Sequence, residues 1–229
     1  MTIMKFLTLL ILFFTFSCLP KKTVQLPEIS HADVTEVWDV SPAYLFYDES
    51  KTDSVELNRT NLISTTNWLV NVDKRLTLGQ AIPKIIQLQD KKRNAEVHKN
   101  ENSKNYYTCN DTSIKNLGFL EFTPVIYKMN YVSPNISSDY DKPHEKRIII
   151  DFKSVNDIKL VSVFNDSIIK KSTLQHLIED LRALSPDASY EFFLNLNEAL
   201  SFQEYITFKS TLAKMASSKM IINENEFIY

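Results

Sequence analysis

Residues 160–215 read LVSVFNDSIIKKSTLQHLIEDLRALSPDASYEFFLNLNEALSFQEYITFKSTLAKM, and their pattern changes from strand to helix and back. The first residues are apolar and β-branched, and the polar run 165–167 is a turn signal. Ser172 and Gln175 have the spacing of a capping box, which predicts the start of a helix. The apolar residues after this cap, at spacings of three and four, would share one helical face. They are Leu174, Leu177, Ile178, Leu181 and Leu184.

A second strand and helix come next in the same stretch. Residues 190–196 are predicted to form a buried strand, and Ser201 with Glu204 is a second capping box. Residues 147–152 are strand-like on the N-terminal side. On the C-terminal side, strand material is formed by Lys219, Met220, Ile221 and Ile222, and then by Phe227, Ile228 and Tyr229. This order predicts an α+β unit of two layers, with a mixed or antiparallel sheet and helices on one face.

The preceding part, residues 37–129, contains a fainter version of the same signals. Residues 44–47 and 68–72 are strand-like, and Thr77 with Gln80 repeats the cap spacing. The apolar residues after this cap have the same offsets as those after Ser172; they are Leu78, Ala81, Ile82, Ile85 and Leu88. We therefore expect a first α+β unit, and the sequence leaves open whether it is a degenerate repeat of the second.

Other residues suggest where the elements end. Because proline costs a hydrogen bond inside a helix, the regular part of the first helix is expected to begin at Pro83. The charged residues 90–104 are expected to form a solvated loop, and residues 119–127 a strand. The complete organisation expected is a signal peptide at 1–17, a lipid-anchored tether at 18–36, a first unit at 37–129, a linker at 130–146 and a second unit at 147–229.

The N-terminus has the three parts of an export signal. Lys5 precedes an apolar run from Phe6 to Phe16, which even when extended to Leu19 is shorter than the roughly 20 residues of a membrane-spanning helix. Ser17-Cys18 resembles the end of a bacterial lipobox, in which the cysteine is lipidated and the peptide is cleaved before it. Two alternatives are ordinary secretion after Ser17 and an uncleaved anchor. We expect lipidation at Cys18, and so an exported protein on the periplasmic face or the outer membrane.

Composition excludes several chemistries. The chain has only two glycines, Gly79 and Gly118, too few for a phosphate-binding loop or a G-x-S-x-G elbow. Its net charge of -2 does not favour nucleic acid as a partner. The histidines are scattered without metal-ligand spacing. Cys109 with His98 could be read as a nucleophile and its base, but both lie in a polar, Asn- and Lys-rich stretch without the signs of a pocket. We expect no cofactor, no metal and no catalytic residue.

Residues 158–229, which include the whole stretch 160–215, resemble the periplasmic domain of the ExbD/TolR family, the small partners of proton-driven motors that energise outer-membrane transport. The resemblance lies in the order of elements and implies the same two-layer fold. Two departures are informative. The family has a proton-coupling aspartate in a membrane helix, whereas residues 6–19 contain no acidic residue. Asn197, Glu198 and Ala199 stand where the family tends to have an acidic residue and a glycine.

These observations predict a non-enzymatic, lipid-anchored protein of the bacterial cell envelope that acts through protein contacts. The resemblance implies an accessory role in biopolymer transport, with another copy or another envelope protein as the partner. The C-terminal strand residues Lys219 to Ile222 and Phe227 to Tyr229 are expected near a sheet edge and are the candidate contact residues. The alternatives are a secreted or periplasmic enzyme of unrecognised class and a surface-exposed, adhesin-like lipoprotein.

Overall fold

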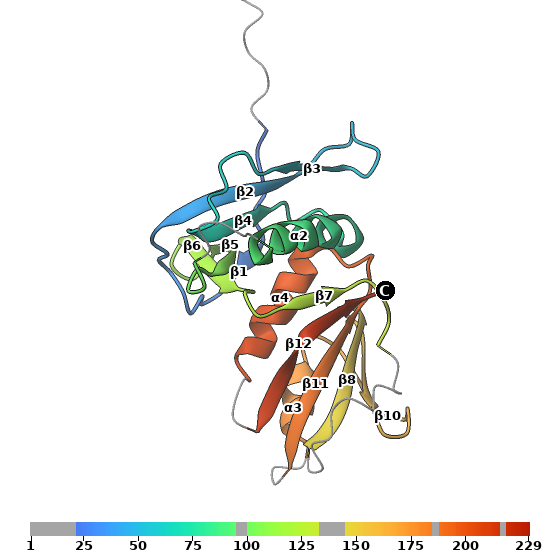
Figure 1. Cartoon of the computed structure of the whole chain (residues 1–229). Helices are drawn as coiled ribbons and strands as arrows, with labels where there is room; N and C mark the ends of the chain where they lie inside the picture. Colours follow the sequence, from blue (N-terminus) through green and yellow to red (C-terminus); the bar gives the residue numbers. More distant parts are fainter. Residues whose placement is uncertain (1–21, 95–99, 133–144, 185–187, 216–218) are drawn as a thin grey trace, which may run out of the picture.

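The computed structural model describes residues 22–94, 100–132, 145–184, 188–215 and 219–229, which form two six-stranded sheets in two stacked halves (Figure 1). Each sheet mixes parallel and antiparallel strands, and helices cover them, so the chain is an α+β protein. The predicted signal peptide, Cys18 and most of the predicted linker lie outside the described residues.

The first half contains a sheet with the strand order β3-β2-β4-β5, to which β1 and β6 add beside β5. Its elements are β1 (Glu28–Ile29), β2 (Val40–Tyr47), β3 (Val55–Asn58), β4 (Asn67–Val72), α2 (Leu78–Arg93), β5 (Asn105–Asp111) and β6 (Asn116–Glu121). In β4, the buried side chains Trp68, Val70 and Val72 alternate with half-buried neighbours. This period of two is typical of a strand that has one face on the core.

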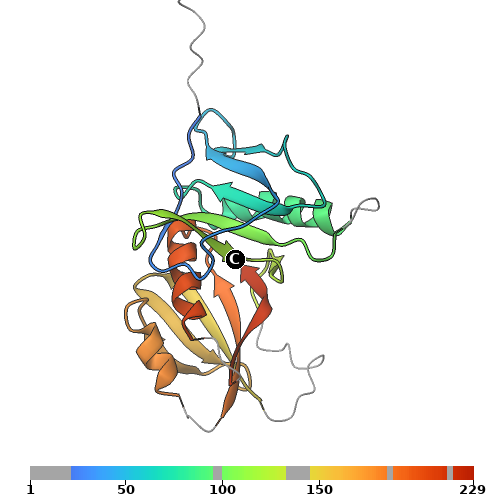
Figure 2. The same cartoon turned by 90° about the vertical axis from the view of Figure 1, so that its left-hand side faces the viewer.

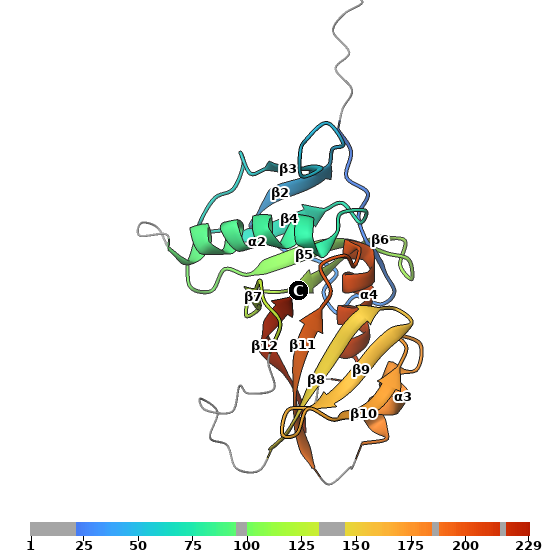
Figure 3. The same ribbon diagram turned by 90° about the vertical axis from the view of Figure 1, so that its right-hand side faces the viewer.

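The second half contains a sheet with the order β10-β9-β8-β11-β12-β7. Its elements are β7 (Ile126–Lys128), β8 (Glu145–Ser154), β9 (Asp157–Ser162), β10 (Ile168–Ser172), α3 (Leu177–Arg182), β11 (Ser189–Leu196), α4 (Phe202–Ala213) and β12 (Met220–Ile228). Figure 2 and Figure 3 show α4 beside this sheet, where it reaches the first half. The buried residues Ile149, Val161 and Phe193 form a separate small cluster with Val132.

The two halves share a topology. In the first half, an antiparallel hairpin (β2 and β3) is followed by β4 parallel to β2, helix α2, and β5 parallel to β4. In the second half, β8, β9, β11, α4 and β12 repeat these relationships. The counterpart of α2 is therefore α4. The apolar spacing after Thr77 was compared with that after Ser172, which is not the equivalent helix.

Two of the three predicted capping boxes are confirmed, at Thr77 with Gln80 and at Ser201 with Glu204. The third is wrong, because Ser172 ends β10, where it pairs with Ile158. There the Ser172 hydroxyl donates to Asp180 at 2.6 Å. Helix α3 starts only at Leu177 and has no side-chain cap. Strand pairing thus takes precedence over the local cap signal.

Pro83 does not begin a helix but lies inside α2, which starts at Leu78. The first turn is stabilised from the other half of the molecule, because the Gly79 N–H donates to the Glu198 carbonyl at 2.9 Å. In return, the Gln203 N–H of α4 donates to the Lys74 carbonyl at 3.2 Å. These bonds satisfy backbone groups that the beginning of a helix leaves free.

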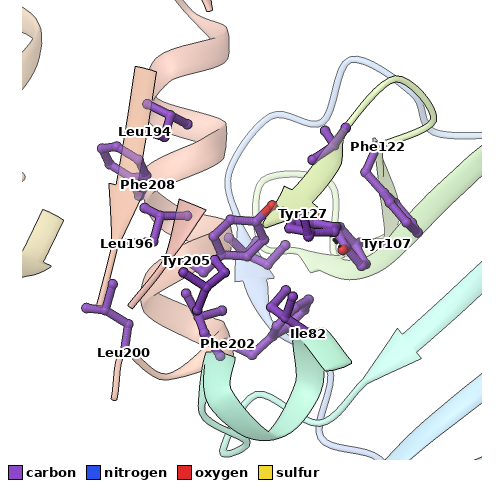
Figure 4. Close-up of a cluster of buried hydrophobic side chains, with 14 of the residues drawn as sticks. Ile82, Tyr107, Phe122, Tyr127, Leu194, Leu196, Leu200, Phe202, Tyr205 and Phe208 are labelled. Atoms are coloured by element: carbon purple, nitrogen blue, oxygen red, sulfur yellow. Dashed lines mark hydrogen bonds between the residues drawn. The ribbon is translucent and has the colours of Figure 1, made fainter. Parts of the chain in front are cut away.

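One apolar core runs through both halves. Figure 4 shows Ile82 of α2, Tyr107 of β5, and Phe202 and Tyr205 of α4 gathered between the sheets. The Tyr107 ring stacks on Phe122 at 3.9 Å between centroids and meets Phe202 edge-on at 5.1 Å. Helix α4 therefore belongs to the core of both sheets.

The sheet boundaries differ from the predicted unit boundaries. The predicted strand 119–127 is divided between β6 in the first sheet and β7 in the second, where Tyr127 is in register with Glu226 of β12. Part of the predicted tether is folded: β1 pairs with β5, and the Gln25 carbonyl accepts from the Lys74 N–H at 2.8 Å. The stretch from Gln25 onward is therefore part of the first half.

Candidate interaction surface

The predicted contact residues lie along one continuous strand, β12. It pairs with β11 at Tyr190 to Phe192 and again at Leu194 to Leu196, with a register shift between these two stretches. Strand β7 covers its other side only at Asn225 to Phe227. Among the described residues, the part from Met220 to Glu224 therefore has one side without a neighbouring strand.

The first group of predicted residues lies on this free part. The Ile221 side chain is 43% exposed. Met220 and Ile222 are half-buried and line a small apolar hollow with Met215 of the segment after α4. Before the strand, the Lys219 carbonyl accepts from the Tyr190 N–H at 2.8 Å. The free part thus presents the apolar Ile221 side chain outward, while Met220 and Ile222 pack towards Leu181 of α3 and Leu212 of α4.

The second group is built into the fold. Ile228 is buried, and the Tyr229 hydroxyl donates to Asp151 at 2.6 Å. The Tyr229 ring packs edge-on against the Tyr131 ring, with 4.9 Å between centroids. Burial and the hydrogen bond to Asp151 raise the pKa of the Tyr229 hydroxyl above its usual value. Phe227 packs against the small cluster around Val132. Strand β12 lies next to the edge strand β7, and Phe227, Ile228 and Tyr229 are held within the fold instead of forming a free edge.

A buried polar chain fixes this end of β12. The hydroxyls of Tyr107 and Tyr127 lie 2.6 Å apart, and those of Tyr127 and Tyr205 lie 2.9 Å apart. The Tyr205 hydroxyl then donates to Glu226 of β12 at 2.8 Å, and Lys209 of α4 pairs with the same carboxylate. Burial raises the pKa of all three tyrosines well above the usual value, so the hydroxyls stay protonated. Sequence spacing gave no signal for this network, because its members come from four elements.

The beginning of the predicted charged loop, residues 90–104, is helical and contains a buried lysine. Helix α2 extends to Arg93, and Lys92 is only 8% exposed. Its ammonium donates to the carbonyls of Thr66 and Lys104 and to the Asn105 side chain, at 2.9–3.2 Å, and lies 4.9 Å from the centre of the Trp68 ring. Burial lowers the Lys92 pKa to about 8. Its three donors are satisfied, so Lys92 links α2 to the strand ends.

Cys109 is inaccessible in this fold. The side chain is fully buried in β5, and burial raises the pKa of its thiol to about 12. His98, the base considered with it, lies outside the described residues. Across the described ranges, no three His, Cys, Asp or Glu side chains are grouped as metal ligands. No helix in that same part of the chain is long and apolar enough to cross a membrane.

No protein-family model matches this chain, and neither does any curated protein or solved structure. Its function is therefore inferred from the fold and from the surfaces that the fold leaves uncovered.

Proposed function

We propose that this protein is a lipid-anchored bacterial envelope protein with ExbD/TolR-like modules that acts through protein contacts. Its partner is another copy or another envelope protein, in an accessory role to an energy-transducing transport system. The observation that carries the proposal is the free part of β12, Met220 to Glu224, which carries the exposed Ile221. A strand edge offers backbone N–H and C=O groups that a partner strand can bind.

The rest of β12 supports such a contact. The ion pair of Glu226 with Lys209 and the hydroxyl of Tyr205 hold the strand where β7 pairs with it. The free part is thus presented from a rigid base, which lowers the entropy lost on binding. Apolar burial of a side chain such as Ile221 contributes about 1.5–3 kcal/mol when complete.

The position of the anchor agrees with an accessory role. Lys22, the first described residue, pairs with Asp48 and Glu56 on the first half. The chain from Cys18 to Lys22 can span at most about 14 Å when fully extended. A lipid on Cys18 would therefore keep the folded body close to the bilayer. Because residues 6–19 contain no acidic residue, the protein would not itself conduct protons.

Labelling with palmitate in bacterial cells tests the anchor. Wild type and Cys109→Ala should both incorporate label and fractionate with membranes, whereas Cys18→Ala should do neither. Cys109→Ala is the matched control because it removes the only other cysteine. A wild type that is exported but unlabelled and soluble would contradict the proposal.

A further inference from the structure

An exposed phenylalanine, Phe164, lies in the turn between β9 and β10. The Phe164 side chain is 97% exposed. The turn that carries it is held firmly: the Ser162 N–H donates to the Ser167 carbonyl at 2.9 Å, and the Asp166 N–H returns to the Ser162 carbonyl at 3.0 Å. The Ser167 hydroxyl also donates to Asn165 at 2.7 Å. A large apolar group held on a rigid turn loses little entropy when it is buried by a partner.

The neighbouring residues extend this feature into an apolar patch with charges around it. Ile168 and Ile169 are 51% and 45% exposed. Lys159 and Lys171 lie opposite each other on β9 and β10. Within the described ranges, neither lysine has a carboxylate in ion-pair distance, although Lys170 pairs with Asp180. We call Phe164 with these isoleucines and lysines the hairpin knob.

A hollow of about 370 Å³ lies where the first half meets the C-terminal end of α4. It is bordered by residues 29–34, by β6 and by the end of α4. Its apolar lining comes from Ile29, Ala32, Val34, Phe119, Leu120 and Ala213, and its charged and titratable groups are Asp33, Glu121, His31 and Lys214. Because an apolar cavity of about 150 Å³ binds benzene, this hollow is large enough for a phenyl ring.

We propose that the hairpin knob of one copy binds the hollow of a second copy, with the Phe164 ring against its apolar lining. The charges are complementary: Lys159 and Lys171 would meet Asp33 and also Glu121, which pairs with Lys104 in the single copy, while Asp166 at the turn would meet Lys214. Knob and hollow are different surfaces, so the contact is heterologous and continues from copy to copy. It uses neither the free part of β12 nor Cys18, and so it does not depend on the proposed function.

Sedimentation of the full-length protein in detergent tests this contact with two complementary variants. Phe164→Ser removes the knob and keeps the hollow, while Ala213→Trp fills the hollow at an exposed position and keeps the knob. Wild type should form a concentration-dependent series of oligomers, and each variant alone should raise its dissociation constant at least tenfold. An equimolar mixture should form dimers that grow no further, because only one knob and one hollow remain intact.

Ile114→Ser, at another exposed apolar side chain, is the control and should behave like wild type. Unchanged circular dichroism would show that the variants fold. Variants that keep the wild-type size distribution would overturn the proposal, and so would a mixture that stays monomeric. Loss of association in Ile221→Lys but not in Phe164→Ser would assign self-association to β12 instead. Knob-dependent binding to vesicles with 30% anionic lipid, without self-association, would also overturn it.

Discussion

Thr77 and Ser201 pair with each other in an antiparallel bridge, and each is the N-cap of a helix, α2 or α4. The bonds around them are reciprocal: the Leu78 N–H donates to the Leu200 carbonyl at 2.9 Å, and the Phe202 N–H donates to the Leu76 carbonyl at 2.7 Å. The two halves are thus joined about a local twofold axis at their equivalent positions. When the two halves are aligned in sequence at these caps, identical residues fall at equivalent positions: Asn71 and Asn195, Leu76 and Leu200, Ile82 and Ile206, and Leu88 and Leu212.

Removing either cap should destabilise the whole molecule. Thr77→Ala and Ser201→Ala should each lower the free energy of unfolding by about 0.5–2 kcal/mol, because each hydroxyl satisfies a backbone N–H. Urea unfolding followed by circular dichroism and by tryptophan fluorescence should show one shared transition. Thr60→Ala, the same change in an exposed loop, should have almost no effect. Separate transitions for the two probes would show that the halves unfold independently.

The tyrosine chain should contribute measurably to stability. Tyr127→Phe removes the hydroxyl that connects Tyr107 to Tyr205 and should cost about 1–3 kcal/mol, because two buried groups each lose a partner. Tyr44→Phe is the matched control, since Tyr44 is half-buried and its hydroxyl has no hydrogen bond within the described part of the chain. Equal denaturation midpoints for both variants would argue against a structural role of the chain.

The two glycines should respond differently to substitution. A Cβ on Gly118 would lie 2.5 Å from the Ala32 Cβ, so Gly118→Ala should displace the segment that contains Ala32. A Cβ on Gly79 would lie 3.3 Å from the Glu198 Cβ, a tight contact that a shift of a few tenths of an ångström relieves; because alanine also favours a helix there, Gly79→Ala should have a much smaller effect. Hydrogen exchange should rise around residues 28–34 only in Gly118→Ala. Unchanged exchange there would show that this segment is not held against β6.

Cys109 should produce a dependence of stability on alkaline pH. Burial raises its thiol pKa from 9.0 to about 12, so the folded protein keeps a proton that the unfolded chain loses. This contribution is complete below pH 9 and is lost as pH rises towards 12. The stability of Cys109→Ala should therefore fall less steeply than that of wild type above pH 9. Ellman's reagent should react with native Cys109 only on unfolding, and rapid reaction of the native thiol would contradict its burial.

Local signals predicted the elements better than their arrangement. The caps at Thr77 and Ser201 and the strand 190–196 are confirmed, because hydrogen bonds within a few residues and continuous burial determine them. The cap predicted at Ser172 is wrong because Ser172 pairs with Ile158 of β9. The spacing of residues around Ser172 carries no signal for this strand pairing.

The candidate surface could be predicted only in part. The apolar pattern indicated strand residues at both ends of β12, but not that β7 would cover the second end. That pairing depends on Tyr127, far away in the chain, and on the buried carboxylate of Glu226. Deleting residues 226–229 would therefore remove buried parts of the core, and it could not separate binding from folding.

Photocrosslinking at residue 221 in living cells tests the central claim most directly. A benzophenone side chain in place of Ile221 should form a covalent product, in the membrane fraction, with a second copy or another envelope protein. The same group in place of Lys115, in the exposed turn between β5 and β6, should form none. An Ile221 variant that folds, reaches the envelope and gives no product would contradict the account.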